Sequence, residues 1–177
     1  MAVRPAHPQS DGAVCAAIYS HYDRAGWATF EEDAPPAGEM EDRIRRTLAT
    51  HPWLVDEREG AVAGYAYASA HHARAGYRWT VDVAVYVRPD RRGEGIGRAL
   101  YDDLLRRLRA QGFRMACAGI ALPNPASVGL HEAVGFRPVG VYRDIGFKHG
   151  AWRDVGWWQL PLAPDAPQPP PEPLPPQ

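Results

Sequence analysis

The sequence predicts an α/β (α+β) domain around one mixed, mostly antiparallel sheet, and three observations carry that prediction. The expected elements follow the order β-α-α-β-β-β-α-β-α-β-β, which mixes hairpins with two strand–helix–strand units. A strongly β-prone run at 78–87 has valine at every second position from residue 81 on. Three glycines then separate that run from an amphipathic helix pattern. A doubly wound parallel sheet would instead need strands and helices in regular alternation.

The chain is long enough for one domain with a sizeable core. It has 177 residues, of which 45% are hydrophobic, and we expect a single domain over residues 1–160. Proline dominates residues 161–177, so a disordered tail is expected there. The formal net charge of −1 offers no general basic field for nucleic acid or an anionic membrane, so any anion site must be local.

The cysteines favour a reducing compartment. Cys15 and Cys117 are far apart, match no metal or redox spacing, and each lies in an apolar run. We therefore expect reduced, buried thiols, a cytoplasmic location and no bound metal. We also expect no signal peptide and no membrane-spanning segment, because no apolar run has the necessary length or position.

The first half of the chain predicts two helices and a hairpin. A short strand at 2–5 precedes a helix over 10–24, whose first residue is a serine that can cap it. An irregular loop leads to a second helix over about 39–50. Residues 53–57 and 61–70 then form a β-hairpin around a short turn that contains glycine.

The strand at 78–87 is expected at the centre of the sheet, with one face in the core. That face carries Val81, Val83, Val85 and Val87, and the opposite face carries Thr80, Asp82, Ala84 and Tyr86. The helix that follows the glycines is expected to end at Gln111, with Gly112 as its C-cap residue.

The last part of the chain predicts one helix and three strands. A strand is expected over 114–122. Asn124-Pro125 then starts a helix that ends at Gly135, with asparagine as the N-cap and proline in the first turn. Two final strands, 139–147 and 155–160, are expected around a turn.

The three glycines, Gly93, Gly95 and Gly97, allow bare backbone to come close to a charged ligand. A dinucleotide loop needs G-x-G-x-x-G and a nucleotide-phosphate loop needs G-x-x-x-x-G-K followed by serine or threonine, and neither spacing is present. A pyrophosphate held by backbone N–H groups at the helix N-terminus remains, with charge-assisted hydrogen bonds from Arg92 and Arg98. The alternative is a plain tight turn with solvated arginines.

Longer stretches resemble a known family. Arg92-x-x-Gly95-x-Gly97 matches the Arg/Gln-x-x-Gly-x-Gly/Ala signature of the GNAT superfamily of N-acetyltransferases, which binds the pyrophosphate of acetyl-CoA. With "WTVDVAVYV", "GRALYDDLL", "GLHEAVGFRPVG" and "KHGAWRDVGWWQ", residues 2–160 resemble the phosphinothricin N-acetyltransferase branch, also called methionine sulfoximine acetyltransferases. The resemblance implies a sheet splayed between its fourth and fifth strands and flanked by about four helices. Acetyl-CoA would be the co-substrate, with its pantetheine arm in the gap as a pseudo-strand.

The resemblance also implies the contacts to acetyl-CoA. Backbone groups of Val85, Tyr86 and Val87 would pair with the pantetheine arm and the acetyl group. The pyrophosphate would be held by Arg92, Gly93, Gly95, Ile96, Gly97 and Arg98. Asn124 and Ser127 would meet the arm from the other side, although a simple helix cap explains Asn124 as well.

Asp82 is the carboxylate best placed to act as a base. Amide formation from a thioester needs a neutral amine, and a free α-amine has a pKa near ~8. Asp82 lies three residues before Val85, on the face opposite the valines. In the resembled branch this position is usually Glu, and because Asp is one methylene shorter, a bridging water is expected. The alternative is a structural carboxylate held by nearby backbone N–H groups.

His131 and Tyr101 are expected to serve the leaving thiolate. By resemblance, His131 occupies the position of the acid that protonates the thiolate, and a pKa near ~6.5 would suit that role. Tyr101 is a second donor near the thiol. The alternatives are a helix histidine packed between apolar neighbours and an aromatic ring on the core face of its helix.

The substrate implied by the resemblance is a small amino acid analogue with an α-carboxylate and a tetrahedral phosphinate, sulfoximine or sulfone. Such a ligand needs cationic and amide donors. Arg74 and Tyr77, just before the central strand, are the first candidates, and Phe30 could wall the amino acid side. Lys148 and its neighbour His149 could line the pocket, from the same or a partner subunit. Each could also be a solvated loop charge or a core aromatic.

Other functions stay open on the sequence. The same fold could acetylate a polyamine, an aminoglycoside or a protein N-terminus, or it could bind acyl-CoA as a non-catalytic sensor. The proline tail could serve as an SH3-type ligand. For the acetyltransferase, we expect a homodimer by resemblance, with residues 156–160 ("GWWQL") at its interface, and no nucleic acid or membrane partner.

Overall fold

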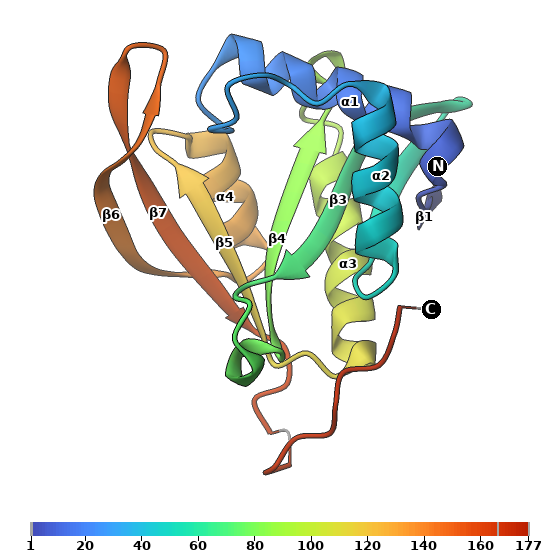
Figure 1. Ribbon diagram of the computed structural model, residues 1–177, viewed down its shortest axis with the longest axis vertical. Coiled ribbons are helices and arrows are strands. Elements are labelled where there is room, and N and C mark those ends of the chain that lie inside the picture. The colour runs from blue at the N-terminus through green and yellow to red at the C-terminus, as the bar shows by residue number, and fades with distance from the viewer. Residues whose placement is uncertain (1, 166, 177) are drawn as a thin grey trace.

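A seven-stranded mixed sheet runs through the centre of the molecule (Figure 1). The computed structural model describes residues 2–165 and 167–176 of the chain. The strands of the described residues are β1 (Ala2–Pro5), β2 (Trp53–Arg58), β3 (Ala61–Ala70), β4 (Thr80–Val87), β5 (Met115–Ala121), β6 (Arg137–Lys148) and β7 (Ala151–Pro161). They lie in the order β1-β2-β3-β4-β5-β7-β6; β4 and β5 are parallel, and the other neighbouring pairs are antiparallel. The predicted α/β (α+β) class with a mixed, mostly antiparallel sheet is confirmed.

Helices cover both faces of the sheet. In the described chain these are α1 (Pro8–Ala25), α2 (Ala37–Leu48), α3 (Ile96–Gln111) and α4 (Pro125–Ala133), with two short 3-10 helices, η1 (Ala75–Tyr77) and η2 (Pro89–Arg91). α1 and α2 pack on one face around Ile44 and Tyr65, and α3 packs on the other through Leu100, Leu104 and Leu108. The four-residue spacing of these leucines produces one continuous apolar stripe. No helix in the described part of the chain is long and apolar enough to cross a membrane.

The first helix begins earlier than the sequence pattern predicts. α1 starts at Pro8 with His7 as its N-cap residue, so the predicted cap at Ser10 is wrong. Proline suits the first helical position because its fixed φ is already helical and its missing N–H would be unpaired there. Asp11 then reaches back to accept a hydrogen bond from the His7 backbone N–H at 2.7 Å, and Arg4 pairs with the same carboxylate at 2.7 Å.

The sheet opens between β4 and β5, as expected from the resemblance. The two strands pair only at Thr80–Met115, Val81–Ala116 and Asp82–Cys117 among the described residues. Beyond this point β5 continues along β7, and β4 continues along β3. The valine face of β4 is in the core as predicted, since Val81 and Val83 are buried. One edge of β4 therefore faces a gap from residue 83 onward.

The proline-rich segment lies against the end of the domain from which β4 starts (Figure 1). The domain boundary near residue 160 stays a prediction, and the disorder expected beyond it contrasts with specific contacts in residues 162–165 and 167–176. Leu162 is buried in the core. The Trp79 indole N–H donates to the Pro171 carbonyl at 2.7 Å, and the Leu174 N–H donates to the Gln111 carbonyl at 2.8 Å. Proline carbonyls still accept hydrogen bonds, so a chain without regular structure can be held in this way.

Candidate active site

A cavity of about 630 Å³ lies where β4 and β5 separate. It is lined by the β4 edge at 83–87, the glycine turn with the start of α3, the end of α1, residues 119–121 of β5 and the first turns of α4. All eleven residues predicted to contact acetyl-CoA line it: Val85, Tyr86, Val87, Arg92, Gly93, Gly95, Ile96, Gly97, Arg98, Asn124 and Ser127. Tyr101 and His131 line it too, whereas Asp82, Phe30, Arg74, Tyr77 and Lys148 lie outside its lining.

The glycine turn exposes backbone N–H groups at one end of the cavity. Gly93 and Gly95 have φ of 83° and 78°, in the left-handed region that favours glycine. Gly95 is the N-cap of α3, and the first intrahelical hydrogen bond runs from the Ala99 N–H to the Gly95 carbonyl at 3.0 Å. The N–H groups of the first helical residues therefore have no partner within the helix. Such a terminus stabilises an anion through its donors and its dipole.

The two predicted arginines differ in their freedom. Arg92 lies over the ring of Tyr22, with its guanidinium carbon 5.2 Å from the ring centroid. Arg98 points its Nε toward Asp102 at 3.1 Å and donates from Nη1 to the Ala133 carbonyl, also at 3.1 Å. Arg92 is therefore the better placed cation for a phosphate, because an aromatic face holds the guanidinium while its N–H groups stay available.

The open edge of β4 is partly occupied by a residue that the sequence reasoning missed. The Tyr22 hydroxyl donates to the Val87 carbonyl at 2.6 Å and thereby links the end of α1 to β4. Tyr22 falls on the apolar face of its helix, so its spacing indicated a core residue and gave no sign of a cavity wall. The Arg88 N–H donates to the Ala63 carbonyl of β3, so by strand alternation the backbone groups of Tyr86 also face β3, and those of Val83 and Val85 remain for a pseudo-strand.

His131 and Tyr101 form a buried pair. Asn124 caps α4 by accepting from the Ser127 N–H at 3.2 Å, as predicted. The Ser127 carbonyl lies 2.7 Å from His131 Nδ1, and because a carbonyl only accepts, Nδ1 carries the hydrogen. His131 Nε2 must then accept from the Tyr101 hydroxyl at 2.8 Å. Burial lowers the pKa of His131 and raises the pKa of Tyr101, so both groups are neutral near pH 7.

Asp82 has a partner that the sequence reasoning did not assign. Its Oδ1 lies 2.7 Å from His71 Nδ1, and both side chains are about one-third exposed. Burial raises the pKa of the Asp82 carboxyl, and the hydrogen bond from His71 opposes that shift. His71 directly follows β3. A polar residue at the end of an apolar strand, just before the candidate substrate residues, was the sequence feature that could have identified it as a site residue.

Cys117 lies beside this pair and is half-buried, not fully buried as predicted. Its sulfur, a His71 ring nitrogen and an Asp82 oxygen all lie within 4.8 Å of one another. Burial, and then the Asp82 charge, raise the pKa of the Cys117 thiol to about 11. The thiol is therefore protonated near pH 7, and it is a poor nucleophile for a covalent acyl-enzyme.

Comparison with known proteins decides the family. Residues 6–157 match the acetyltransferase (GNAT) domain model. The chain belongs to the GNAT acetyltransferase family. This acetyltransferase is 42% identical over 172 residues to a phosphinothricin N-acetyltransferase of Streptomyces viridochromogenes, covering 97% of this chain and 93% of the relative. It is 36% identical to an L-methionine sulfoximine/L-methionine sulfone acetyltransferase of Salmonella typhimurium, over 89% of this chain and 96% of the relative.

A solved structure of a relative has the same fold. It is a GNAT superfamily phosphinothricin acetyltransferase from Sinorhizobium meliloti in complex with acetyl-CoA, with a TM-score of 0.87 and 40% sequence identity. The match covers 91% of this acetyltransferase and 88% of that chain.

The candidate substrate residues lie on the α1–α2 side of the sheet, in two groups. Tyr77 is near Asp82, because its ring centroid is 6.0 Å from that of His71, and Arg74 precedes it on the same exposed turn. Phe30 is elsewhere: its ring packs against Gly146 of β6, where a Cβ atom would clash with it.

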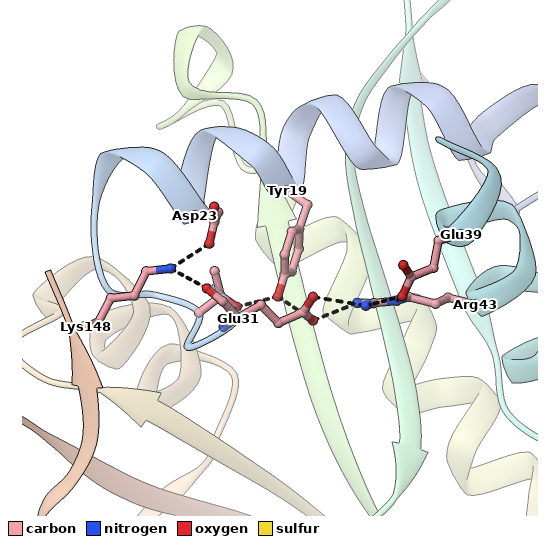
Figure 2. A network of polar contacts seen from close by, with 7 residues as sticks. Tyr19, Asp23, Glu31, Glu39, Arg43 and Lys148 are labelled. Atoms are coloured by element: carbon pink, nitrogen blue, oxygen red, sulfur yellow. Dashed lines mark hydrogen bonds and ion pairs between the residues drawn. The ribbon is translucent and has the colours of Figure 1, made fainter. Parts of the chain in front are cut away.

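Lys148 belongs to a polar network that joins the β6–β7 hairpin to α1 and α2 (Figure 2). Its Nζ lies 2.7 Å from Asp23 Oδ1 and also contacts the Glu31 carbonyl, and both charged side chains are buried. The Glu31 carboxylate accepts two hydrogen bonds from Arg43, at 2.7 and 3.0 Å, and one from the Tyr19 hydroxyl at 3.0 Å. The ammonium predicted to bind substrate is thus engaged within the protein.

Replacing Lys148 with methionine is expected to lower the free energy of unfolding by about 3 kcal/mol or more, because it leaves Asp23 buried and unpaired. The double variant Asp23→Leu with Lys148→Met should recover most of that loss, since it removes both buried charges. Urea unfolding measures both. Unchanged stability together with a raised KM for the amine would instead assign the ammonium to the substrate.

The stability of the acetyltransferase is expected to fall as the pH drops from about 6.5 toward 5. Burial lowers the pKa values of His131 and His51 in the folded state. The unfolded chain then takes up protons first, so the free energy of unfolding rises with pH in this window. His131→Gln should flatten that slope, by at most about 1.4 kcal/mol per pH unit. Urea unfolding at several pH values checks this, with the exposed His72→Gln as control; an unaltered slope in His131→Gln would contradict it.

Proposed function

We propose that this GNAT acetyltransferase uses acetyl-CoA to acetylate the amino group of a small amino acid analogue of the phosphinothricin, methionine sulfoximine or methionine sulfone type. The observation that carries the proposal is the cavity between β4 and β5, with a glycine turn at one end and the Asp82 side chain just beyond its wall. Relatives that match nearly the whole chain carry these activities in their names.

The cavity fits acetyl-CoA. Its volume of about 630 Å³ is within the range of cofactor sites. The backbone donors at Gly95–Gly97 and the Arg92 guanidinium suit a pyrophosphate, and the free edge of β4 suits the amide groups of a pantetheine arm. Bound in this way, acetyl-CoA would present its thioester near residues 83–85, one to three residues from Asp82.

In the Tyr101–His131 pair, the Tyr101 hydroxyl is the group that donates a hydrogen bond to the sulfur of the thioester as it leaves. His131 is neutral and its Nε2 accepts from Tyr101, so it holds no spare proton near pH 7. A leaving thiolate, with a thiol pKa near ~8.5, is a weaker base than a phenolate whose pKa is raised by burial. We infer that Tyr101 turns its O–H toward the thiolate and stabilises it, and that a solvent proton completes the thiol.

The exposed turn of η1 supplies the side chains that we propose bind the amino acid substrate. Tyr77 lies beside His71 and Asp82, and Arg74 offers a guanidinium for a carboxylate or phosphinate. We propose that Phe30, in the loop before α2, forms a wall of the substrate pocket on the same face of the sheet. Lys148 would act here indirectly, because it holds that loop through the Glu31 carbonyl.

Release of free thiol from acetyl-CoA tests the function. Phosphinothricin, methionine sulfoximine and methionine sulfone are expected to drive it, whereas spermidine, an aminoglycoside and a peptide N-terminus should not. Turnover with one of the latter alone would reassign the substrate. Binding of coenzyme A in a calorimeter without turnover of any amine would favour a non-catalytic sensor.

We also infer a homodimer formed through the β6–β7 hairpin. Val139, Tyr142, Ile145, Phe147 and Trp152 are each more than half exposed there. In the segment at 156–160, by contrast, Trp158 and Leu160 are buried in the core of the chain, which leaves little of it for an interface.

The free thiols of both cysteines support a cytoplasmic location for the enzyme.

Serine at both Phe147 and Trp152 is expected to convert the dimer into a monomer, because it removes apolar area from the interface. Sedimentation velocity measures this. Leu174→Ser, an exposed apolar residue on the tail, is the matched control. A wild-type protein that sediments as a monomer would rule out the dimer.

A further inference from the structure

The fold places His71 and Asp82 together on one face of the sheet. The His71 N–H donates to the Thr80 carbonyl at 3.3 Å, which aligns the end of β3 with the start of β4. His71 Nδ1 and Asp82 Oδ1 are 2.7 Å apart. Because an ionised carboxylate only accepts, Nδ1 carries the hydrogen and the lone pair of the neutral imidazole is on Nε2. The carboxylate thus selects the tautomer in which Nε2 is a base.

The side chains that face the His71–Asp82 pair do not compete with it as proton acceptors. Tyr67 comes from β3, Tyr77 from η1, Cys117 from β5 and Trp157 from β7. Burial raises the pKa values of Tyr67 and Cys117, so both stay protonated near pH 7. The His71 and Asp82 side chains are 28% and 32% exposed, which lets a small amine reach them.

The pair also borders the cavity. Val83 and Ala84, directly after Asp82, line it. Gly119 lines it on the β5 side, and the Trp157 ring lies 3.3 Å from where a Cβ of Gly119 would be. His71 contacts that same ring edge-on, with the centroids 5.9 Å apart. A thioester at the β4 edge would therefore be close to the imidazole.

We propose that His71 is the catalytic base of this enzyme and that Asp82 orients it and stabilises its protonated form. This assignment rests on the proposed function. The substrate ammonium passes one proton to Nε2, and the freed lone pair of the amine attacks the thioester carbonyl. The new C–N bond forms as the C–S bond breaks, the nitrogen loses its second proton to solvent, and solvent protonates the departing thiolate, while the imidazolium remains paired with the carboxylate. No further reactant is needed.

The His71–Asp82 pair has two advantages over an aspartate alone: it reaches further toward the substrate, and it is a stronger base. Aspartate is short, and an imidazole in hydrogen-bond contact extends it toward the substrate. Imidazole, with a pKa near ~6.5, is also a stronger base than a carboxylate near ~3.9, and it is closer to the amine near ~8. Efficient general-base catalysis requires such matching.

Chemical rescue tests the assignment in the full-length enzyme. His71→Ala is expected to lower kcat about 100-fold with an unchanged Kd for acetyl-CoA, consistent with loss of a general base. Added imidazole should restore much of the rate in a saturable way, and the low-pH limb of kcat should be lost without imidazole. His7→Ala, at an exposed histidine before α1 and outside the cavity lining, is the control and should keep the wild-type rate.

The possible outcomes distinguish a failure of the base assignment from a failure of the proposed function. A wild-type rate in His71→Ala would overturn the base assignment and leave the acetyltransferase function intact. A slow variant that imidazole does not rescue would reduce His71 to a structural residue, which also overturns the assignment. If the wild-type enzyme turned over none of the amines, the proposed function itself would fail.

Discussion

Replacing Asp82 with asparagine is expected to lower kcat by roughly two to four orders of magnitude, the usual contribution of general acid–base catalysis. The variant keeps the shape of the side chain but removes its charge. An amide cannot stabilise an imidazolium on His71 as a carboxylate 2.7 Å away does. It can also turn its NH₂ toward Nδ1 and select the wrong tautomer.

The measurement is steady-state kinetics with saturating acetyl-CoA and the best amine of the panel. Asp42→Asn, which neutralises an exposed carboxylate on α2, is the matched control and should be silent. Binding of acetyl-CoA to the Asp82 variant should be unchanged, because this side chain lies outside the cavity lining. A rate within a few-fold of wild type would show that the carboxylate is only structural.

Replacing Gly95 with valine is expected to weaken acetyl-CoA binding about 100-fold or more. The backbone at Gly95 has φ of 78°, which a β-branched residue adopts only with strain. Relief of the strain rotates the peptide units at the start of α3 and turns the N–H groups away from the pyrophosphate. Loss of two charge-assisted hydrogen bonds costs about 3 kcal/mol or more, and each 1.4 kcal/mol is tenfold in Kd.

Gly60 supplies the matched control for strain. It has nearly the same φ, 79°, with open space around it, in the β2–β3 turn outside the cavity lining. Gly60→Val should therefore lose a similar amount of stability and still bind acetyl-CoA normally in calorimetry. Equal affinity in the two variants would mean that the glycine turn does not hold the pyrophosphate.

The local features of the fold were predictable because they depend on neighbours a few residues apart. Gly112 ends α3 in the left-handed conformation, and Asn124 caps α4, as their positions in the sequence indicate. Alternation of valines identified the buried face of β4. Where the local pattern failed, at Ser10, a competing local signal from Pro8 and Asp11 prevailed.

The candidate site was predictable only in part. The glycine turn is contiguous in the sequence, so its residues could be assigned to one ligand before the structure was known. The parting of β4 and β5 came from the resemblance to a family, since strand periodicity does not reveal where two strands stop pairing. Tyr22 was missed because it reaches β4 from 65 positions away in the chain. His71 is only 11 positions from Asp82, and it was missed because the β3–β4 register that brings the two side chains together cannot be read from local periodicity.

By itself, then, the sequence determined the order of the elements, the exposed amides of the glycine turn and Asp82 as the one carboxylate on the open strand. Tertiary structure alone decided what those groups meet. The Lys148–Asp23 pair spans 125 positions, and the Tyr101–His131 pair spans 30. Such contacts depend on strand register and helix packing, in which every element sets the position of the others, and no short window of residues contains that information.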